Sequence, residues 1–286
     1  MTLLLSATLA SALAQDAVVV PPPSLAADPV RPDAFSRHTS VVPDTRKFSG
    51  QRAILVASHV RDPLVFRPAG SDEVIAIVGP VWGMTGGLAW SNGPIAVAAT
   101  LPAQFAIGSD LHDDRPASAL GDIALDGRFV GLDATSAPVG VSGQLRLTAP
   151  LGGDDQYMGQ PGFTWELLAV GEVTPASWAI CAAIGTRGVP EVEIPGQSLD
   201  DLLVYRLAVS HALATGGLTG EFLGQRQYQG FVDDPSNSPL EVLLGGWVDL
   251  DEDERHTLRG ALGWGVNPGI GSPQVRVLVG VGSLTP

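Results

Sequence analysis

The fold is decided by residues 139–149, whose sequence is Val-Gly-Val-Ser-Gly-Gln-Leu-Arg-Leu-Thr-Ala. Apolar and polar residues alternate along this stretch. Because successive side chains of a β-strand point to opposite faces, the stretch predicts a strand with one apolar face and one polar face. The two faces are Val139, Val141, Leu145, Leu147 and Ala149 against Ser142, Gln144, Arg146 and Thr148.

Residues 162–174 repeat the pattern and complete a predicted hairpin, residues 138–174. Each arm runs for ten or more residues, which is about twice a usual strand and enough for a tilted strand to cross a bilayer. The hairpin predicts the repeating unit of a transmembrane β-barrel, with polar side chains facing a lumen and apolar ones facing lipid. A soluble secreted all-β protein shows the same alternation and is the alternative fold. The second arm sets Phe163, Trp165, Leu167, Ala169 and Val173 against Thr164, Glu166 and Glu172.

Alternation with period two recurs in about twelve segments, which predicts an all-β fold, an antiparallel transmembrane β-barrel of about twelve strands. The chain contains 35 Gly and 23 Pro, as expected where many turns separate many strands. The segments are residues 50–60, 73–83, 88–107, 120–131, 138–149, 162–174, 176–185, 201–212, 217–228, 239–250, 256–266 and 273–283.

The connections between these segments alternate in length. An outer-membrane barrel has short periplasmic turns and longer outer loops, whereas a soluble sandwich has no reason to keep that order. The alternation therefore favours a location in the cell outer membrane. The long connections are residues 61–72, 108–119, 150–161, 186–200 and 229–238, and the short ones are residues 84–87, 132–137, 174–175, 213–216 and 251–255.

Composition excludes several other classes of protein. The 286 residues contain no run of eighteen apolar residues, which argues against a transmembrane helix. The formal net charge of -14 argues against nucleic-acid binding, which depends on basic residues. Cys181 is the only cysteine, so no internal disulfide can form. The tryptophans lie mostly toward segment ends, as in an interfacial girdle: Trp82, Trp90, Trp165, Trp178, Trp247 and Trp264.

The N-terminal part predicts two further regions. Residues 1–14 combine a short apolar run with Ala12-Leu13-Ala14, which is typical of a signal peptide and its cleavage site, although no basic residue precedes the run. Residues 15–48 are rich in proline and show little periodicity, which predicts an extended, Pro-rich periplasmic linker. The barrel is then expected over residues 49–286.

Several turn motifs resemble those of a known family. Gly121-Asp122-Ile123-Ala124-Leu125, entering a strand, and residues 147–154, leaving one, are similar to signatures of proteobacterial outer-membrane porin-like proteins. Tyr157-Met158-Gly159 and Asp62-Pro63-Leu64-Val65 also fit. Together they resemble the barrel of myxobacterial-type proteins of the outer-membrane protein A family, without the peptidoglycan-binding domain that members often carry after it. The resemblance implies an OmpA-like barrel over residues 49–286.

No motif for a metal, a phosphate or a dinucleotide is present, so we expect no cofactor, no metal site and no catalytic residue. Ser58-His59 and Ser210-His211 resemble nucleophile–base pairs. Adjacent residues of a strand point to opposite faces, so neither pair makes its own contact, and only a cross-strand pairing stays open. We therefore do not expect an enzyme.

The polar faces supply the candidate functional residues, because in a barrel they line the lumen. One interpretation makes them the lining of a porin-like channel, whose charges select small polar solutes. The other makes them a closed network of Arg–carboxylate pairs, as in a structural or interaction protein of the outer membrane. The residues are Asp122, Asp126, Arg128, Gln144, Arg146, Glu166, Glu172, Arg206, Glu221, Gln225, Glu241, Arg259 and Arg276.

The channel is the interpretation we favour, because small residues also fall on these faces. They are Ala124, Ser142, Ala208, Ala261, Gly263, Gly280 and Gly282. The expected partners are outer-membrane lipid and lipopolysaccharide, together with small polar solutes. Acidic residues in the long connections, Asp110, Asp113, Asp114, Asp154, Asp155, Glu191, Glu193, Asp233 and Asp234, are read as solvated loop ends rather than as divalent-cation sites.

Overall fold

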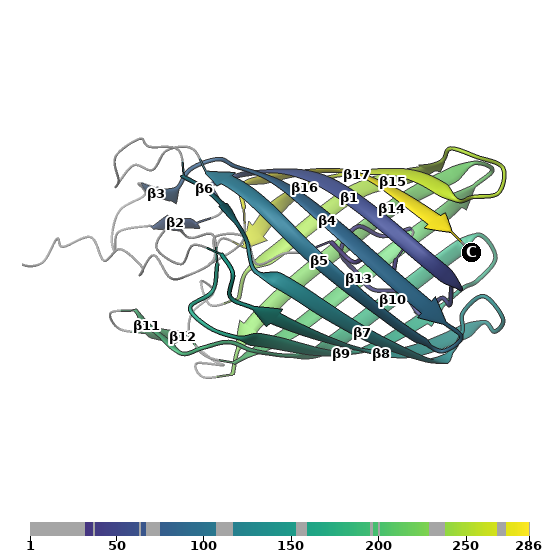
Figure 1. Ribbon diagram of the computed structural model, residues 1–286, viewed down its shortest axis with the longest axis horizontal. Helices are drawn as coiled ribbons and strands as arrows, with labels where there is room; N and C mark the ends of the chain where they lie inside the picture. The colour runs from purple at the N-terminus through teal and green to yellow at the C-terminus, as the bar shows by residue number, and fades with distance from the viewer. Residues whose placement is uncertain are drawn as a thin grey trace, which may run out of the picture.

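The computed structural model describes residues 32–36, 38–62, 64–66, 75–106, 117–152, 159–194, 197–199, 201–228, 238–267 and 273–285. Their regular structure consists of antiparallel β-strands, which curl into a closed barrel (Figure 1). The predicted fold class is confirmed. No helix in this part of the chain is long and apolar enough to cross a membrane.

Twelve strands form the wall, and each pairs with its neighbours. The first and last strands, β1 and β17, close the ring by pairing from Gln51↔Thr285 to Arg61↔Val275. In chain order the wall consists of β1 (Gly50–Arg61), β4 (Val81–Asn92), β5 (Ile95–Ala106), β7 (Ile123–Leu132), β8 (Val139–Ala149), β9 (Thr164–Val173), β10 (Trp178–Gly188), β13 (Leu202–Leu213), β14 (Gly216–Gln227), β15 (Leu240–Asp249), β16 (His256–Asn267) and β17 (Val275–Thr285).

Short strands add to one end of this wall. β6 (Ala117–Leu120) pairs with the end of β5. Two small hairpins, β2 (Leu64–Phe66) with β3 (Ile75–Val78) and β11 (Val192–Ile194) with β12 (Gln197–Leu199), stand beyond the wall at the same end. We call this the loop end, and the opposite end, where the tight connections lie, the turn end.

The second and third predicted segments were placed wrongly. Residues 84–87, taken as a short turn, lie within β4, and the turn falls at Gly93-Pro94. Asn92 pairs with Ile95, so the loop has two residues, and Gly93 has a φ of 62°. Glycine followed by proline suits a type II′ turn, which needs a positive φ at its first central residue. The Gly-Pro pair is itself a turn signal, but the prediction had placed both residues inside one segment, residues 88–107.

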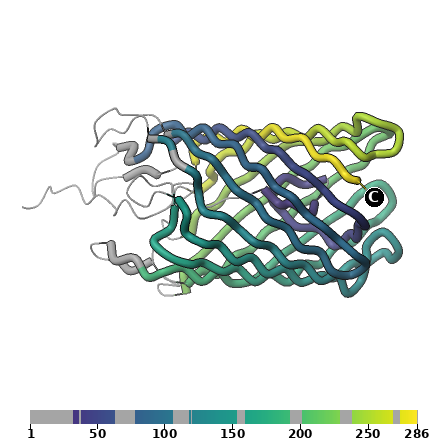
Figure 2. Tube along the Cα trace, viewed as in Figure 1, coloured from purple at the N-terminus to yellow at the C-terminus, as the bar shows by residue number. Residues whose placement is uncertain are grey.

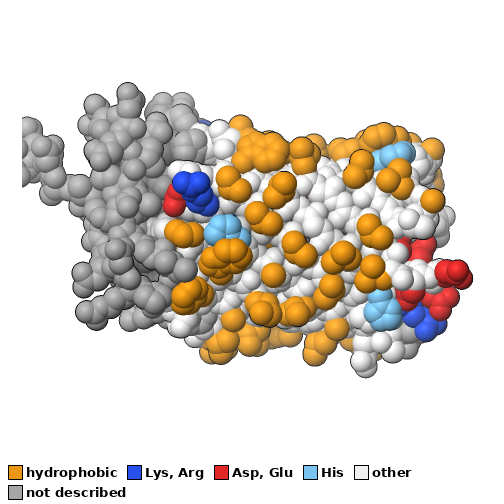
Figure 3. Space-filling view, turned by 90° about the horizontal axis from the view of Figure 1, so that it is seen from above, with side chains coloured by type: hydrophobic (Ala, Val, Ile, Leu, Met, Phe, Trp, Pro, Cys, Tyr) orange, Lys and Arg blue, Asp and Glu red, His pale blue; other side chains and the backbone are white. Residues whose placement is uncertain are grey.

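The outer surface of the wall is apolar. Leu88 is 69% exposed, Leu125 is 55% exposed and Leu145 is 42% exposed. Hydrophobic side chains are spread over the middle of the barrel, while acidic and basic ones lie near its two ends (Figure 3). The side chains of β8 thus point as predicted, with Leu145 and Leu147 outward and Arg146 inward. Such an outer surface fits a hydrocarbon environment.

Five tryptophans form two exposed groups along the barrel. Trp90 and Trp178 lie near the turn end, and Trp82, Trp165 and Trp264 near the loop end, each between 40% and 54% exposed. This is the arrangement of two interfacial girdles. The sixth, Trp247, is 4% exposed and stacks on His38 with ring centroids 4.5 Å apart, so its predicted place in a girdle is wrong.

Candidate functional site: the barrel lumen

The lumen is occupied by the chain itself. Residues 32–36 and 38–49, here called the N-terminal segment, lie inside the barrel (Figure 2). Phe35 is 1% exposed and Val42 is 0% exposed. This segment is the described part of the predicted Pro-rich linker. It lies in the lumen and not extended in the periplasm, because inward side chains of the wall supply its hydrogen-bond partners. The predicted signal peptide lies outside the described residues.

Glu221, in the middle of β14, binds the N-terminal segment through its backbone. Its two carboxylate oxygens accept the N–H groups of Ser40, Val41 and Val42 at 2.6, 2.9 and 2.9 Å. Hydrogen bonds with an ionised partner are stronger than neutral ones. Since a segment without regular structure leaves its N–H groups unpaired, one buried carboxylate here satisfies three of them.

Glu172, near the turn end of β9, makes a second attachment. It accepts the backbone N–H and the hydroxyl of Thr45, both at 2.9 Å, and the Nε–H of Arg46 at 2.9 Å. On β7, Arg128 provides the opposite charge, with its Nη1 2.9 Å from the Asp44 carboxylate. The wall and the segment are therefore complementary in charge as well as in hydrogen bonding.

An apolar belt surrounds Val41 and Val42. It is made of inward side chains of the wall: Val56, Leu168, Val170, Cys181, Ala183, Val204, Ala208, Leu223, Leu243, Ala261 and Leu278. The Cys181 thiol also donates to the carbonyl oxygen of Pro43 at 2.8 Å. The belt was not predicted, although runs such as Val242-Leu243-Leu244, which are apolar on both faces of a strand, indicate it.

Small inward residues make room for the segment. A Cβ at Gly140 would lie 1.8 Å from Thr45 Oγ1 and 2.8 Å from Thr45 Cβ. Ala124 and Ala208 are likewise buried, at 0% and 1% exposure. Three of the small residues that favoured an aqueous passage thus lie beside a peptide: Ala208 and Ala261 belong to the belt around Val41 and Val42, and the Ser142 hydroxyl lies 3.4 Å from the Asp44 carbonyl oxygen.

Toward the loop end, the lumen is crossed by ion pairs of the wall. Asp126 binds Arg146 at 2.7 Å, and Glu241 binds Arg276 at 2.6 Å. Glu166 lies between two guanidinium groups, Arg206 at 2.6 Å and Arg187 at 2.5 Å. The carboxylates are buried, and the guanidinium groups are buried or half-buried. Buried charges of this kind remain ionised only when they are paired, so this half of the lumen forms a polar network.

The predicted lumen residues lie on the inner side of the wall, where all but two are buried and Arg206 and Gln225 are half-buried. Asp122 stands apart, because it precedes β7 and accepts the N–H groups of Leu151, Gly152 and Gln160. It therefore fastens a loop-end connection. Arg187 was not predicted, since it lies near the end of β10, beyond the predicted segment 176–185.

The Ser210-His211 pair makes no contact of its own, and the histidine instead contacts another serine. Ser210 is buried on the inner side, whereas His211 points outward and its Nδ1 lies 3.2 Å from the hydroxyl of Ser177. The His211 ring packs on Trp178 with centroids 4.4 Å apart. The partner is thus a turn residue, and the contact lies in the exposed turn-end girdle.

Comparison with known proteins was made by sequence and by structure. No family model matches the sequence, and no curated protein matches it. The structure is similar to an outer membrane channel from Pseudomonas putida F1, with a TM-score of 0.64 and 13% identity over 86% of this chain and 100% of that one. The chain is an outer-membrane β-barrel. The translocator domain of the autotransporter NalP from Neisseria meningitidis is also similar, with a TM-score of 0.51 and 14% identity over 84% of this chain and 90% of that one.

A third similar structure is the KdgM porin, solved in complex with disordered oligogalacturonate. Its TM-score is 0.51, with 6% identity over 82% of this chain and 99% of that one. At these identities the likeness shows the fold alone, and the fold together with the apolar outer surface places this barrel in the outer membrane. Membership of the outer-membrane protein A family stays a prediction.

Proposed function

We propose that this barrel is an outer-membrane channel for small polar solutes, closed in this conformation by its own N-terminal segment. The observation that carries the proposal is the way in which the segment is held. It contributes no strand to the wall and is bound through inward groups such as Glu221, Glu172 and Arg128. Because water can replace those hydrogen-bond partners, the segment can leave while the wall stays closed on itself.

The apolar belt sets the resting state of the channel. When Val41 and Val42 occupy it, apolar side chains on both sides are removed from water. A hydrophobic constriction also resists wetting, which is one way in which channels are gated. The closed state is therefore favoured at rest, and passage of solutes requires displacement of the segment. The solutes then meet charged groups of both signs on either side of the belt.

A second candidate is a structural or interaction protein with a permanently closed lumen. The belt favours it too, because displacement of the segment exposes large side chains such as Leu168, Leu223 and Leu243 to water. In both candidates the outer surface meets outer-membrane lipid and lipopolysaccharide, and neither assigns a catalytic role to the chain. The two candidates differ in whether the segment moves.

Pro43→Cys tests that movement. Cys181 is the only cysteine, and its sulfur lies 2.8 Å from the Pro43 carbonyl oxygen, so a thiol at position 43 lies beside it. The purified variant is inserted into planar bilayers, and conductance is recorded under oxidising and then reducing conditions. Wild type and Pro43→Cys/Cys181→Ser receive the same treatment as controls, since neither can form the cross-link.

For a channel, we expect conductance events from the reduced variant, loss of these events on oxidation, and no effect of oxidant on either control. A permanently closed barrel gives no conductance in any state, even where gel migration shows correct folding. That result would replace the channel by the structural candidate.

A further inference from the structure

Most arginines inside the barrel have a carboxylate partner. Two do not: in the part of the chain that the structure describes, neither Arg52 of β1 nor Arg259 of β16 forms an ion pair. A buried or half-buried guanidinium without a carboxylate at ion-pair distance is costly, because carbonyl oxygens replace only part of its lost hydration and bring no opposite charge. The arginines that do lie at ion-pair distance from a carboxylate are Arg46, Arg128, Arg146, Arg187, Arg206 and Arg276.

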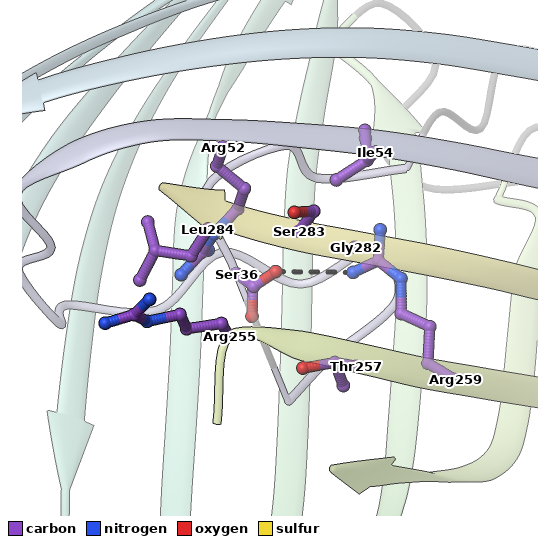
Figure 4. A pocket seen from close by; sticks show the side chains of 9 residues that line it. All are labelled: Ser36, Arg52, Ile54, Arg255, Thr257, Arg259, Gly282, Ser283 and Leu284. Atoms are coloured by element: carbon purple, nitrogen blue, oxygen red, sulfur yellow. Dashed lines mark hydrogen bonds between the residues drawn. The ribbon is translucent and has the colours of Figure 1, made fainter. Parts of the chain in front are cut away.

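The two unpaired arginines line the same pocket, at the turn-end mouth of the lumen. Arg255, in the turn before β16, is the third arginine of the lining. Figure 4 shows the three around Ser36 of the N-terminal segment. Hydroxyl groups of Thr257 and Ser283 complete the polar part of the pocket, and none of the described residues that line it is an Asp or a Glu.

Arg259 has an unused donor in this pocket. Its Nη1 donates to the carbonyl oxygens of Ser36 and Thr39, at 3.3 and 2.9 Å. Arg259 is only 7% exposed, and its Nη2 is buried without a hydrogen-bond partner among the described residues. Since buried N–H groups are normally paired, this nitrogen marks a place for an acceptor that comes from outside the chain.

Neighbouring carboxylates do not fill that place. Both oxygens of Glu221 already accept N–H groups of the segment. The Asp33 carboxylate accepts the N–H groups of Phe35 and Ser36. Asp253 lies 3.6 Å from Arg255, but both side chains are at least half exposed, so this pair is screened by solvent.

We propose that this pocket binds a compact oxyanion, such as inorganic phosphate or the carboxylate of a small solute. Guanidinium groups present planar, paired donors that match the oxygens of both anions. Arg259 supplies its free Nη2, Arg52 supplies positive charge from β1, which is separated from β16 by β17, and Arg255 supplies it from the turn before β16. Ser36 of the N-terminal segment also lines the pocket, so a bound anion lies between the wall and that segment.

Calorimetric titration of the full-length protein in detergent tests the site. Inorganic phosphate, acetate and uncharged glycerol are titrated separately at constant ionic strength. We expect saturable binding of phosphate or acetate, or both, at concentrations up to the order of millimolar, and none of glycerol. Phosphate alone, or acetate alone, identifies which oxyanion geometry the pocket accepts.

Two variants and a control make the result specific. Arg259→Gln removes the unpaired guanidinium and should abolish the binding, whereas Arg255→Gln, which changes a half-exposed residue, should weaken it about tenfold. Arg61→Gln removes an arginine of comparable exposure at the loop end and should leave it unchanged. Equal binding by wild type and Arg255→Gln, or no anion binding at all, would overturn the proposal. Because conductance is not measured, failure here leaves the proposed channel untouched.

Discussion

The backbone nitrogen of Val42 lies 2.9 Å from a carboxylate oxygen of Glu221, so the N-terminal segment and the barrel wall share a charged hydrogen bond inside the lumen. The same carboxylate holds Ser40 and Val41. One side chain of the wall therefore fixes three consecutive residues of the occupant, directly beside the apolar belt. This makes Glu221 the most sensitive point at which to loosen the closed state.

Glu221→Gln should release the segment without breaking the wall. The amide keeps one acceptor oxygen and loses the charge, and a bond to a charged group contributes about 1.5–3 kcal/mol. We expect the Cys181 thiol, which the segment covers, to react about tenfold faster with a water-soluble thiol reagent. Glu166→Gln is the matched control, because Glu166 binds arginines of the wall. Equal rates for wild type and Glu221→Gln would contradict the role assigned to Glu221.

Gly140→Ala should displace the segment by steric conflict, since the added Cβ would lie 1.8 Å from Thr45 Oγ1. Overpacking of this kind typically costs about 1–3 kcal/mol. We expect a similar gain in Cys181 reactivity, partly reversed by adding Thr45→Gly. Gly143→Ala serves as the neutral comparison, because the nearest atom to its Cβ is 3.9 Å away. A Gly140→Ala protein as unreactive as wild type would show that Thr45 does not sit against Gly140.

Glu166→Leu should destabilise the barrel, because it leaves Arg187 and Arg206 buried without their carboxylate. Removing one partner of a buried pair costs about 3–5 kcal/mol. Arg206→Ala should cost less, since Glu166 keeps Arg187 at 2.5 Å. Urea unfolding, followed by the shift of the folded band on a gel, measures both. If neither variant is less stable than wild type, the loop-end half of the lumen is hydrated and its pairs are screened.

Leu145→Arg should hinder membrane insertion. Leu145 is 42% exposed on the outer surface near the centre of β8, where an arginine costs about 2–4 kcal/mol. Leu151→Arg places the same charge beyond the strand, where Leu151 is 60% exposed, and should be tolerated. Folding into lipid vesicles, measured by heat-modifiable migration, compares the two. Equal yields would mean that Leu145 does not face hydrocarbon.

Acid should loosen the turn between β15 and β16. Hydrogen bonds, first that from the His256 backbone N–H, lower the pKa of Asp251 below its ordinary value. A lowered folded-state pKa means that the stabilisation is present above the unfolded-state pKa and is lost as pH falls through the folded-state value. The stability difference between wild type and Asp251→Asn should therefore shrink on acidification below about pH 4. A difference that is constant from neutral pH to pH 2 would contradict this.

The wall of the barrel was predictable because period-two alternation and loop length are local properties. The strand Val139–Ala149 and the number of wall strands were both predicted from them, whereas the Gly93-Pro94 turn was missed. The inward direction of Glu221 and Arg259 was predictable for the same reason. Their partners were not, because Ser40 and Thr39 are about 180 and 220 residues away in sequence, and no local pattern predicts such contacts.

The seam of the barrel joins its first strand to its last, and the N-terminal segment directly precedes that first strand, β1. Inward residues of β7, β9, β14 and β16 all bind the segment. The ring cannot finish closing until β17 docks on β1, by which time these partners are all present. Closure of the barrel and binding of the N-terminal segment are thus coupled. We expect the segment to act as an internal template that sets the curvature of the sheet as its strands are added.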